Sequence, residues 1–265
     1  MRTLSEAFDA GKILIPYIAA GDPDLDTTAE IIGELDKLGV GIIEVGMPFS
    51  DPLADGPIIQ AASQRALAGG TNISRIFEML EELRDVKTPI VLMGYFNPIM
   101  KYGEKSFIED ALSCGVSGVL IPDLPFDEGK EFYDICSEKG LCPIYMVTPN
   151  TKEERLSQIE RKARGFLYCV SLLGITGDKR GPIEGIKSYM ERVRSHVSVP
   201  LALGFGIDSP DKIRAVKPYV DGIVIGSAIV NIISEKADMG RKAIVNEVSV
   251  FTSALIDALR TALQP

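Results

Sequence analysis

Residues 27–46 read TTAEIIGELDKLGVGIIEVG and contain one repeating unit of the fold that the sequence predicts. The first part carries apolar residues at the helical spacing i, i+4 and i+7, namely Ile31, Leu35 and Leu38. This spacing predicts a helix over residues 27–38 with one apolar face. Gly39 follows, and glycine is favoured where a helix ends. The apolar run 40–46 begins directly afterwards and predicts a buried strand.

The same alternation runs along the whole chain. Short runs rich in Val and Ile predict eight strands, at residues 13–20, 40–46, 89–95, 116–122, 141–147, 165–171, 199–204 and 220–226. Stretches of helical period predict helices at residues 27–38, 73–86, 104–114, 128–139, 152–163, 183–196, 211–216 and 241–262. Strands that are apolar throughout are typical of parallel sheets covered on both faces. Eight such units predict an α/β fold, a closed (β/α)8 TIM barrel.

We expect residues 1–265 to form a single barrel domain, with a short N-terminal helix at residues 3–9 that covers the bottom of the barrel. The alternative is an open, doubly wound sheet. Such sheets often carry a G-x-G-x-x-G turn after the first strand, whereas residues 21–24 here are Gly-Asp-Pro-Asp.

Charge and composition exclude several classes of function. The chain has 28 Lys and Arg against 37 Asp and Glu, a net charge of −9, which disfavours nucleic acid and anionic membrane surfaces as partners. The longest apolar stretch, residues 13–20, is far shorter than the roughly 20 residues of a membrane-spanning helix. Four cysteines without a C-x-x-C pair predict free thiols and a cytoplasmic protein, or a stromal one if the chain is a processed plastid form.

The stretch GIIEVGMPFSDPLADGP at residues 41–57 places a carboxyl group inside a predicted strand. Glu44 loses water there, so it must be neutralised, paired or used. Desolvation raises the pKa of a carboxyl group, which suits general acid–base catalysis near neutral pH. The alternative is a structural glutamate held by an ion pair. Asp51 and Asp55 follow in a proline-rich loop, as a second carboxylate over the same barrel mouth or as turn-forming residues.

Three glycine-rich loops follow the last three strands, at residues 174–177 (Gly-Ile-Thr-Gly), 204–206 (Gly-Phe-Gly) and 226–227 (Gly-Ser). Small residues let backbone N–H groups approach an anion, and a helix that opens at Ser227 adds the positive end of its dipole. Barrel enzymes often bind phosphate at this place. We therefore expect a phosphate cradle there, with the loop 172–182 as a mobile lid.

Missing residue types narrow the chemistry further. His196 is the only histidine and ends a predicted helix at the wrong end of the barrel, so we expect it to be structural or on the surface, and we expect no metal site. No lysine lies within a predicted strand, which disfavours a strand-borne Schiff base. If the chain acts on a carbon–carbon bond, general acid–base catalysis by carboxyl groups is therefore the mechanism that remains.

The run PFSDPLADGP at 48–57, with Gly-Ile-Thr-Gly at 174–177 and Gly-Phe-Gly-Ile at 204–207, resembles the tryptophan synthase α subunit family. Further matching segments are 17–23, 43–60, 97–98, 121–125, 171–177 and 225–230. The resemblance implies retro-aldol cleavage of indole-3-glycerol phosphate to indole and glyceraldehyde 3-phosphate.

The resemblance also implies a role for individual residues. Glu44 matches the catalytic acid/base, and Asp55 matches the carboxylate that binds the indole N–H. Tyr168 matches an aromatic residue beside the substrate, and Thr176 matches the lid threonine that orders Asp55. The residues that match the phosphate cradle are Gly177, Gly204, Phe205, Gly206, Gly226 and Ser227.

The family further implies a partner, a β subunit that carries pyridoxal phosphate and forms an αββα assembly. We expect residues 48–57, 97–102 and 125–128 to contact it, and no pyridoxal phosphate to bind this chain. Two alternatives stay open: a stand-alone indole-3-glycerol phosphate lyase, and a regulatory barrel that has lost catalysis. The presence of both Glu44 and Asp55 argues against the second.

Overall fold

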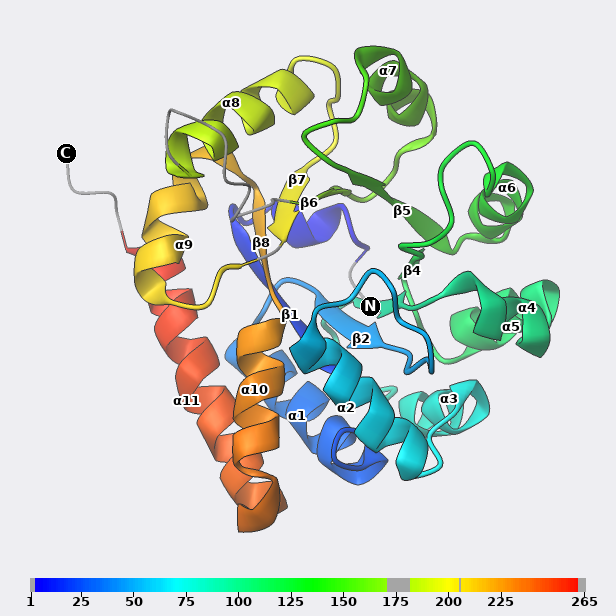
Figure 1. Cartoon of the computed structure of the whole chain (residues 1–265), viewed down its shortest axis with the longest axis vertical. Coiled ribbons are helices and arrows are strands. Elements are labelled where there is room, and N and C mark those ends of the chain that lie inside the picture. Colours follow the sequence, from blue (N-terminus) through cyan, green and yellow to red (C-terminus); the bar gives the residue numbers. More distant parts are fainter. Residues whose placement is uncertain (1–2, 171–181, 205, 262–265) are drawn as a thin grey trace.

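The computed structural model describes residues 3–170, 182–204 and 206–261, and its strands form a closed parallel barrel (Figure 1). The strands, paired in chain order with β8 closing on β1, are β1 Ile13–Ala19, β2 Ile43–Gly46, β3 Ile90–Met93, β4 Gly118–Leu120, β5 Cys142–Val147, β6 Leu167–Val170, β7 Leu201–Gly204 and β8 Gly222–Ile225. Each strand lies within the run that predicted it. Closure confirms the (β/α)8 barrel and excludes the open sheet.

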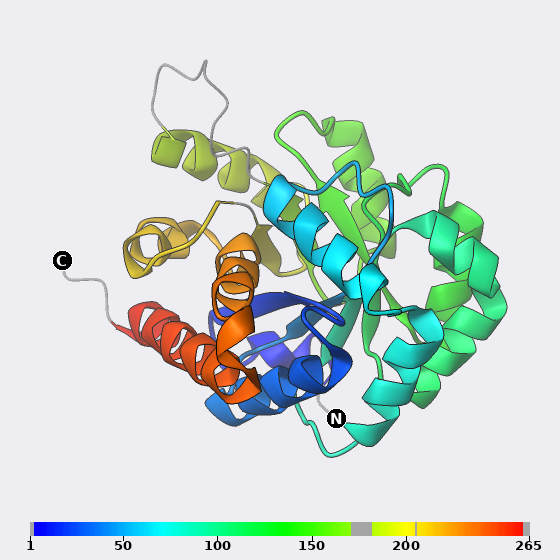
Figure 2. The same cartoon turned by 60° about the horizontal axis from the view of Figure 1, so that its bottom comes forward.

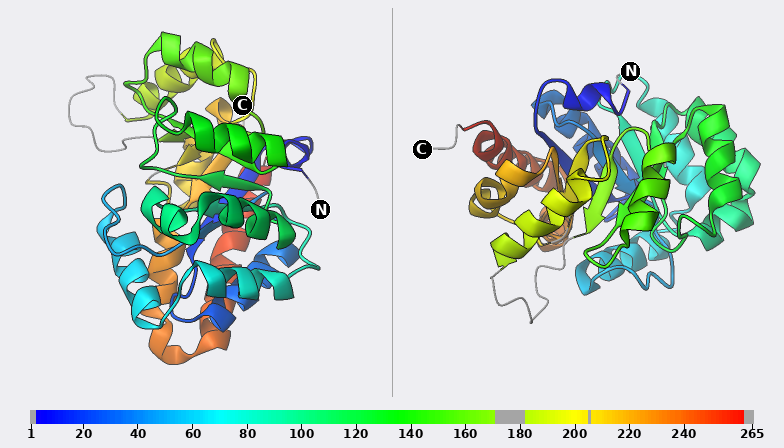
Figure 3. Two further views of the ribbon diagram at one scale, coloured as in Figure 1. Left: turned by 90° about the vertical axis from the view of Figure 1, so that its right-hand side faces the viewer. Right: turned by 90° about the horizontal axis from the view of Figure 1, so that it is seen from above.

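A ring of helices surrounds the barrel, as Figures 2 and 3 show from three further sides. The helices at predicted positions are α1 Leu25–Leu38, α3 Ile73–Glu82, α5 Glu104–Ser113, α6 Lys130–Lys139, α7 Glu153–Lys162, α8 Pro182–Arg194, α9 Pro210–Val216 and α11 Arg241–Arg260. Three more helices fall outside the predicted ranges: α2 Pro57–Ala68, α4 Phe96–Tyr102 and α10 Ser227–Glu235. Their sequences lack a clear apolar stripe, because α2 is rich in alanine, α4 is short and α10 is apolar over most of its surface.

Residues 24–46 show how the sequence determines where α1 begins and ends and where β2 follows. Asp24 caps α1 by accepting a hydrogen bond from the backbone N–H of Thr27 at 2.7 Å. Gly39 ends the helix with a φ of 72°, a left-handed conformation that glycine adopts without steric cost. The chain then turns directly into β2.

Side chains of the strands alternate between two cores. Those that point outward pack under the helices, as Leu14, Ile43 and Leu92 do. Those that point inward fill the barrel, as Ile15, Val91 and Ile144 do, together with Ile42 and Phe166, which directly precede β2 and β6. Glu44 belongs to the inward set, because it lies between the outward residues Ile43 and Val45.

The N-terminal segment covers the bottom of the barrel as expected, although only Glu6–Phe8 is helical and it forms a 3-10 turn rather than a helix over residues 3–9. Leu4 and Ala7 are buried in the interior core, and the ring of Phe8 lies 5.9 Å from that of Phe166.

The structure also bears on the state of the cysteines, on membrane-spanning helices and on metal sites. All four cysteines are free thiols. No helix in the part of the chain that the structure describes has both the length and the apolar character needed to cross a bilayer. Within the same described ranges, no three side chains of His, Cys, Asp or Glu come together as a metal site would require.

Candidate active site

Glu44 is the buried carboxyl group at the centre of the barrel mouth. Its residue is only 1% exposed, and its Oε2 atom has no hydrogen-bond partner among the described residues. Burial raises the pKa of Glu44 to about 8, and the nearby charge of Asp55 adds to the shift. The group is therefore mostly protonated at neutral pH, which favours a role in acid–base chemistry over the alternative of a structural glutamate held by an ion pair.

Asp55 enters the same mouth from the loop between β2 and α2. Tyr95, which precedes α4, holds that loop: its hydroxyl accepts a hydrogen bond from Ala54 N at 2.9 Å, and its ring lies 5.3 Å from that of Phe49. Partial burial raises the pKa of Asp55, while a hydrogen bond from the Tyr95 hydroxyl opposes the rise. The loop thus places a second carboxyl group over the first. Asp51, by contrast, is exposed and bonded to Ser50 in the turn.

Two buried phenols flank the carboxyl groups. Tyr17 on β1 is the ladder partner of Glu44, and Tyr168 projects from β6. Each hydroxyl occupies space that a glycine leaves free: a Cβ atom at Gly46 would lie 2.1 Å from the Tyr17 hydroxyl, and one at Gly204 would lie 2.3 Å from that of Tyr168. Burial raises the pKa of both tyrosines well above the usual value, so both stay neutral donors.

These groups line a cavity of about 290 Å³ at the C-terminal ends of the strands. Most of its wall is apolar and is formed by Ile59, Met93, Met146, Val170, Ile207 and Val224. An apolar pocket with a few converging polar groups is typical of a small-molecule site.

The part of the rim that follows β7 and β8 has the features of an anion cradle. Gly206, Gly226 and Ser227 line the cavity there, and α10 begins at Ser227. The first N–H groups of a helix have no partner within the helix, so they are free to bind an anion. Gly206 has a φ of 76°, and its carbonyl oxygen accepts a hydrogen bond from Lys212.

The structure therefore brings together most of the predicted site residues that it describes: Glu44, Asp55, Tyr168, Gly206, Gly226 and Ser227. Gly204 lies at the end of β7, against the Tyr168 hydroxyl. Thr176, Gly177 and Phe205, and the predicted lid up to residue 181, lie outside the described residues.

Tyr17 and Tyr95 are two residues of the site that the sequence does not predict. A tyrosine within or next to an apolar strand is more often part of a core, and nothing local marks these two. Only the pairing of β1 with β2 and the course of the loop show that they border the carboxyl groups.

His196 lies away from the mouth, as predicted. It follows the C-terminal end of α8, where its Nδ1 atom is 3.0 Å from the carbonyl oxygen of Arg192 and its Nε2 atom is 3.6 Å from Glu153.

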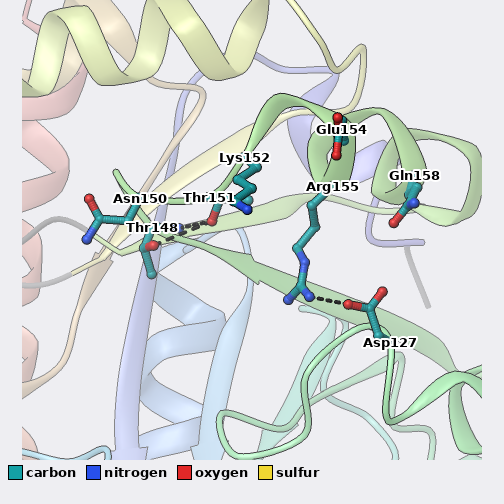
Figure 4. A pocket seen from close by; sticks show the side chains of 8 residues that line it. All are labelled: Asp127, Thr148, Asn150, Thr151, Lys152, Glu154, Arg155 and Gln158. Atoms are coloured by element: carbon teal, nitrogen blue, oxygen red, sulfur yellow. Dashed lines mark hydrogen bonds and ion pairs between the residues drawn. The ribbon is translucent and has the colours of Figure 1, made fainter.

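A second hollow of about 540 Å³ lies beside the β5–α7 connection (Figure 4). Its lining side chains are exposed or half-buried, and several pair with one another, as Arg155 does with Asp127 and Thr148 with Thr151. It holds no desolvated carboxyl group, so the cavity at the barrel mouth is the better candidate.

Comparisons with known proteins identify the family of the chain. The sequence model of the family described as tryptophan synthase alpha chain matches residues 5–260. The tryptophan synthase alpha chain of Petrotoga mobilis is 54% identical over 256 residues, covering 96% of this chain and 99% of that protein. The protein of the same name from Clostridium kluyveri is 46% identical over 256 residues, 96% of each chain.

Solved structures of similar fold point to the same family. Tryptophan synthase subunit alpha from Legionella pneumophila superposes with a TM-score of 0.90 at 33% identity and 98% coverage of both chains. A chain of the Pyrococcus furiosus tryptophan synthase a2b2 complex gives a TM-score of 0.84 at 39% identity, covering 93% of this chain and 99% of that one. The chain therefore belongs to the tryptophan synthase alpha chain family.

Proposed function

We propose that this chain cleaves indole-3-glycerol phosphate to indole and glyceraldehyde 3-phosphate by a retro-aldol reaction. The observation that carries the proposal is the state of Glu44, a desolvated carboxyl group with a pKa of about 8 at the end of an apolar cavity. A carboxyl group of this pKa donates a proton readily at neutral pH and takes one back, as general acid–base catalysis requires.

Asp55 complements Glu44 by accepting the indole N–H. Protonation of indole carbon C3 leaves positive charge on the ring nitrogen, and a carboxylate beside the N–H stabilises that charge. The hydrogen bond from Tyr95 favours the ionised form of Asp55, which this role needs. The two carboxyl groups thus take different roles because their surroundings separate their pKa values.

The proton count closes on Glu44 alone. Its carboxyl proton passes to indole C3, and the resulting carboxylate then takes the proton of the hydroxyl on the adjoining glycerol carbon. That carbon becomes the aldehyde as its bond to C3 breaks, and the bonding electron pair returns to the indole ring. Burial raises the pKa of Tyr168, and the nearby charge of Glu44 adds to the rise, so Tyr168 stays neutral beside Glu44 and can assist the transfer as a hydrogen-bond donor. No oxidant or reductant is needed.

The phosphate of the substrate binds at the part of the rim that follows β7 and β8. Gly206, Gly226 and Ser227 present backbone groups and the N-terminus of α10 to the cavity. Thr176, Gly177 and Phe205 complete the proposed cradle and lid. A cradle of backbone amides suits a chain whose net charge is −9, because it needs no basic side chain.

We also propose a β-subunit partner in an αββα assembly, with pyridoxal phosphate bound by that partner alone. The similar Pyrococcus furiosus chain comes from an a2b2 complex. In this chain, large apolar side chains are exposed around the mouth: Leu53 is 92% exposed, Met100 52% and Ile58 38%. They lie in the β2–α2 loop, on α2 and on α4, all of which follow C-terminal ends of strands, so a partner that covers the mouth could contact them.

The test is to mix the purified chain with indole-3-glycerol phosphate and to measure free indole. We expect Glu44→Gln to lower indole release by about 10³-fold, and Asp55→Asn to lower it as well. Asp51→Asn is the matched control, because it changes an exposed carboxyl group of the same loop and should leave activity intact.

Addition of a β subunit from a related tryptophan synthase should raise the rate several-fold. An unchanged rate would favour the stand-alone lyase. If the wild-type chain releases no indole with or without a β subunit, the proposed reaction is wrong.

A further inference from the structure

Tyr17 is a further polar side chain that lines the cavity beside the carboxyl groups of Glu44 and Asp55. It lies on β1 opposite Glu44 in the strand ladder, and its side chain is buried against the cavity. The roles that the family resemblance implies do not include it. A polar group of this kind inside a catalytic cavity needs an explanation beyond packing.

Two glycines define the direction of the Tyr17 ring. A Cβ atom at Gly226 would lie 3.7 Å from Tyr17 Cβ and Cδ1, so the root of the ring faces the end of β8. A Cβ atom at Gly46 would lie 2.1 Å from the Tyr17 hydroxyl, so the tip of the ring reaches the end of β2. The ring therefore extends from the anion cradle toward the carboxyl groups.

The proposed substrate must cross the same interval. Its phosphate lies at Gly226 and Ser227, and its reacting carbon lies at Glu44, so the glycerol chain passes along Tyr17. Burial and the charges of Asp55 and Glu44 keep the pKa of Tyr17 high, which leaves a neutral hydroxyl that can both donate and accept. The hydroxyl on the middle glycerol carbon is the one polar substrate group that no residue named above contacts.

We propose that Tyr17 is a specificity-determining residue that hydrogen-bonds the hydroxyl on the middle carbon of the glycerol chain. This inference rests on the proposed function, since it names a contact to that substrate. It assigns Tyr17 to recognition of the chain between phosphate and indole, and leaves proton transfer to Glu44.

The experiment pairs one substitution with two ligands. Tyr17→Phe keeps the ring and removes only the hydroxyl. We expect the KM for indole-3-glycerol phosphate to rise by about threefold to tenfold, the loss that corresponds to one neutral hydrogen bond. The dissociation constant of 3-(indol-3-yl)propyl phosphate, which has the ring and phosphate but no chain hydroxyl, should stay the same in calorimetry.

Tyr133→Phe is the matched control, because Tyr133 lies on α6, away from the cavity, and the change removes a buried phenol hydroxyl that donates a hydrogen bond to Leu124 O. It should change neither constant. The inference is overturned if Tyr17→Phe leaves the KM unchanged, or if it weakens the hydroxyl-free ligand as much as the substrate, since the effect would then be one of packing. Cleavage by the wild-type chain tests the proposed function separately.

Discussion

The two ends of the barrel interior are formed by the same strands and are filled in opposite ways. At the N-terminal end, Ile15, Ile42 and Phe166 form an apolar core together with Leu4, which belongs to the segment that covers the bottom of the barrel. At the C-terminal end, the inward positions of the same strands carry Tyr17, Glu44 and Tyr168 around a cavity.

Glycines show the same contrast. A Cβ atom at Gly165 would meet Leu4, an apolar side chain of the bottom layer, at 3.2 Å. At Gly46 and Gly204 the space belongs to phenol hydroxyls. The bottom layer therefore stabilises the barrel, and the mouth holds groups that burial makes costly and reactive. Substitutions at the two ends should separate stability from activity.

The largest expected effect is the change of the free energy of unfolding with pH. The folded-state pKa of Glu44 is about 8 and its reference value is 4.5. Between these values the folded chain holds a proton that the unfolded chain releases, so the free energy of unfolding falls as pH rises, by at most about 5 kcal/mol from this group.

Denaturant unfolding at pH 5 and pH 9 checks this prediction. Glu44→Gln should lose much less stability than the wild type over that range and should be the more stable protein at pH 9. Equal pH dependence in the two proteins would mean that Glu44 does not titrate abnormally.

Phe166→Ala at the bottom should cost about 3–5 kcal/mol of stability, because it opens a cavity in a fully buried layer. Activity per folded molecule should change little, since the residue lies a layer below the site. Unfolding curves combined with indole release at low temperature test both halves. A large loss of kcat in the folded protein would show that the two ends are coupled.

Gly46→Ala should disturb the mouth itself. The new methyl group would displace the Tyr17 hydroxyl, at a cost of about 1–3 kcal/mol in stability together with a higher KM. Gly33→Ala in α1 is the control, because no atom lies within 4 Å of its Cβ position, and it should stabilise the chain by about 0.5–1 kcal/mol. Destabilisation by Gly33→Ala and none by Gly46→Ala would contradict the packing described above.

The rate should also follow the two carboxyl groups. Protonated Glu44 is lost above pH 8, so kcat/KM should fall by about tenfold per pH unit there. The acid limb should lie above the usual range of an aspartate, because burial raises the pKa of Asp55. A pH–rate profile that stays flat up to pH 9.5 would remove Glu44 as the essential acid.

Much of the fold follows from local sequence. Strands buried on both faces are apolar throughout, so all eight could be predicted, and glycines such as Gly39 mark where helices end. Helices without a clear apolar stripe, α2 above all, give no such periodic signal. Their places depend on contacts over the barrel mouth, such as that between Ala62 of α2 and Val230 of α10.

The site also contains residues that the local sequence predicts and residues that it does not. Glu44 could be predicted because a carboxyl group inside an apolar strand is locally inconsistent. Tyr17 could not, since a tyrosine in a strand is consistent with a core. Its importance depends on the register that pairs it with Glu44 and on the absence of a side chain at Gly46, which only the closed barrel brings together.

Glu44 should be a neutral, desolvated acid at neutral pH, and the proposed catalysis depends on this state. NMR of the chain with ¹³C-labelled glutamate carboxyl groups tests it directly, with Glu44→Gln assigning the resonance. We expect the signal that is lost in the variant to titrate near pH 8. A midpoint near 4.5, the ordinary value for a glutamate, would contradict the account.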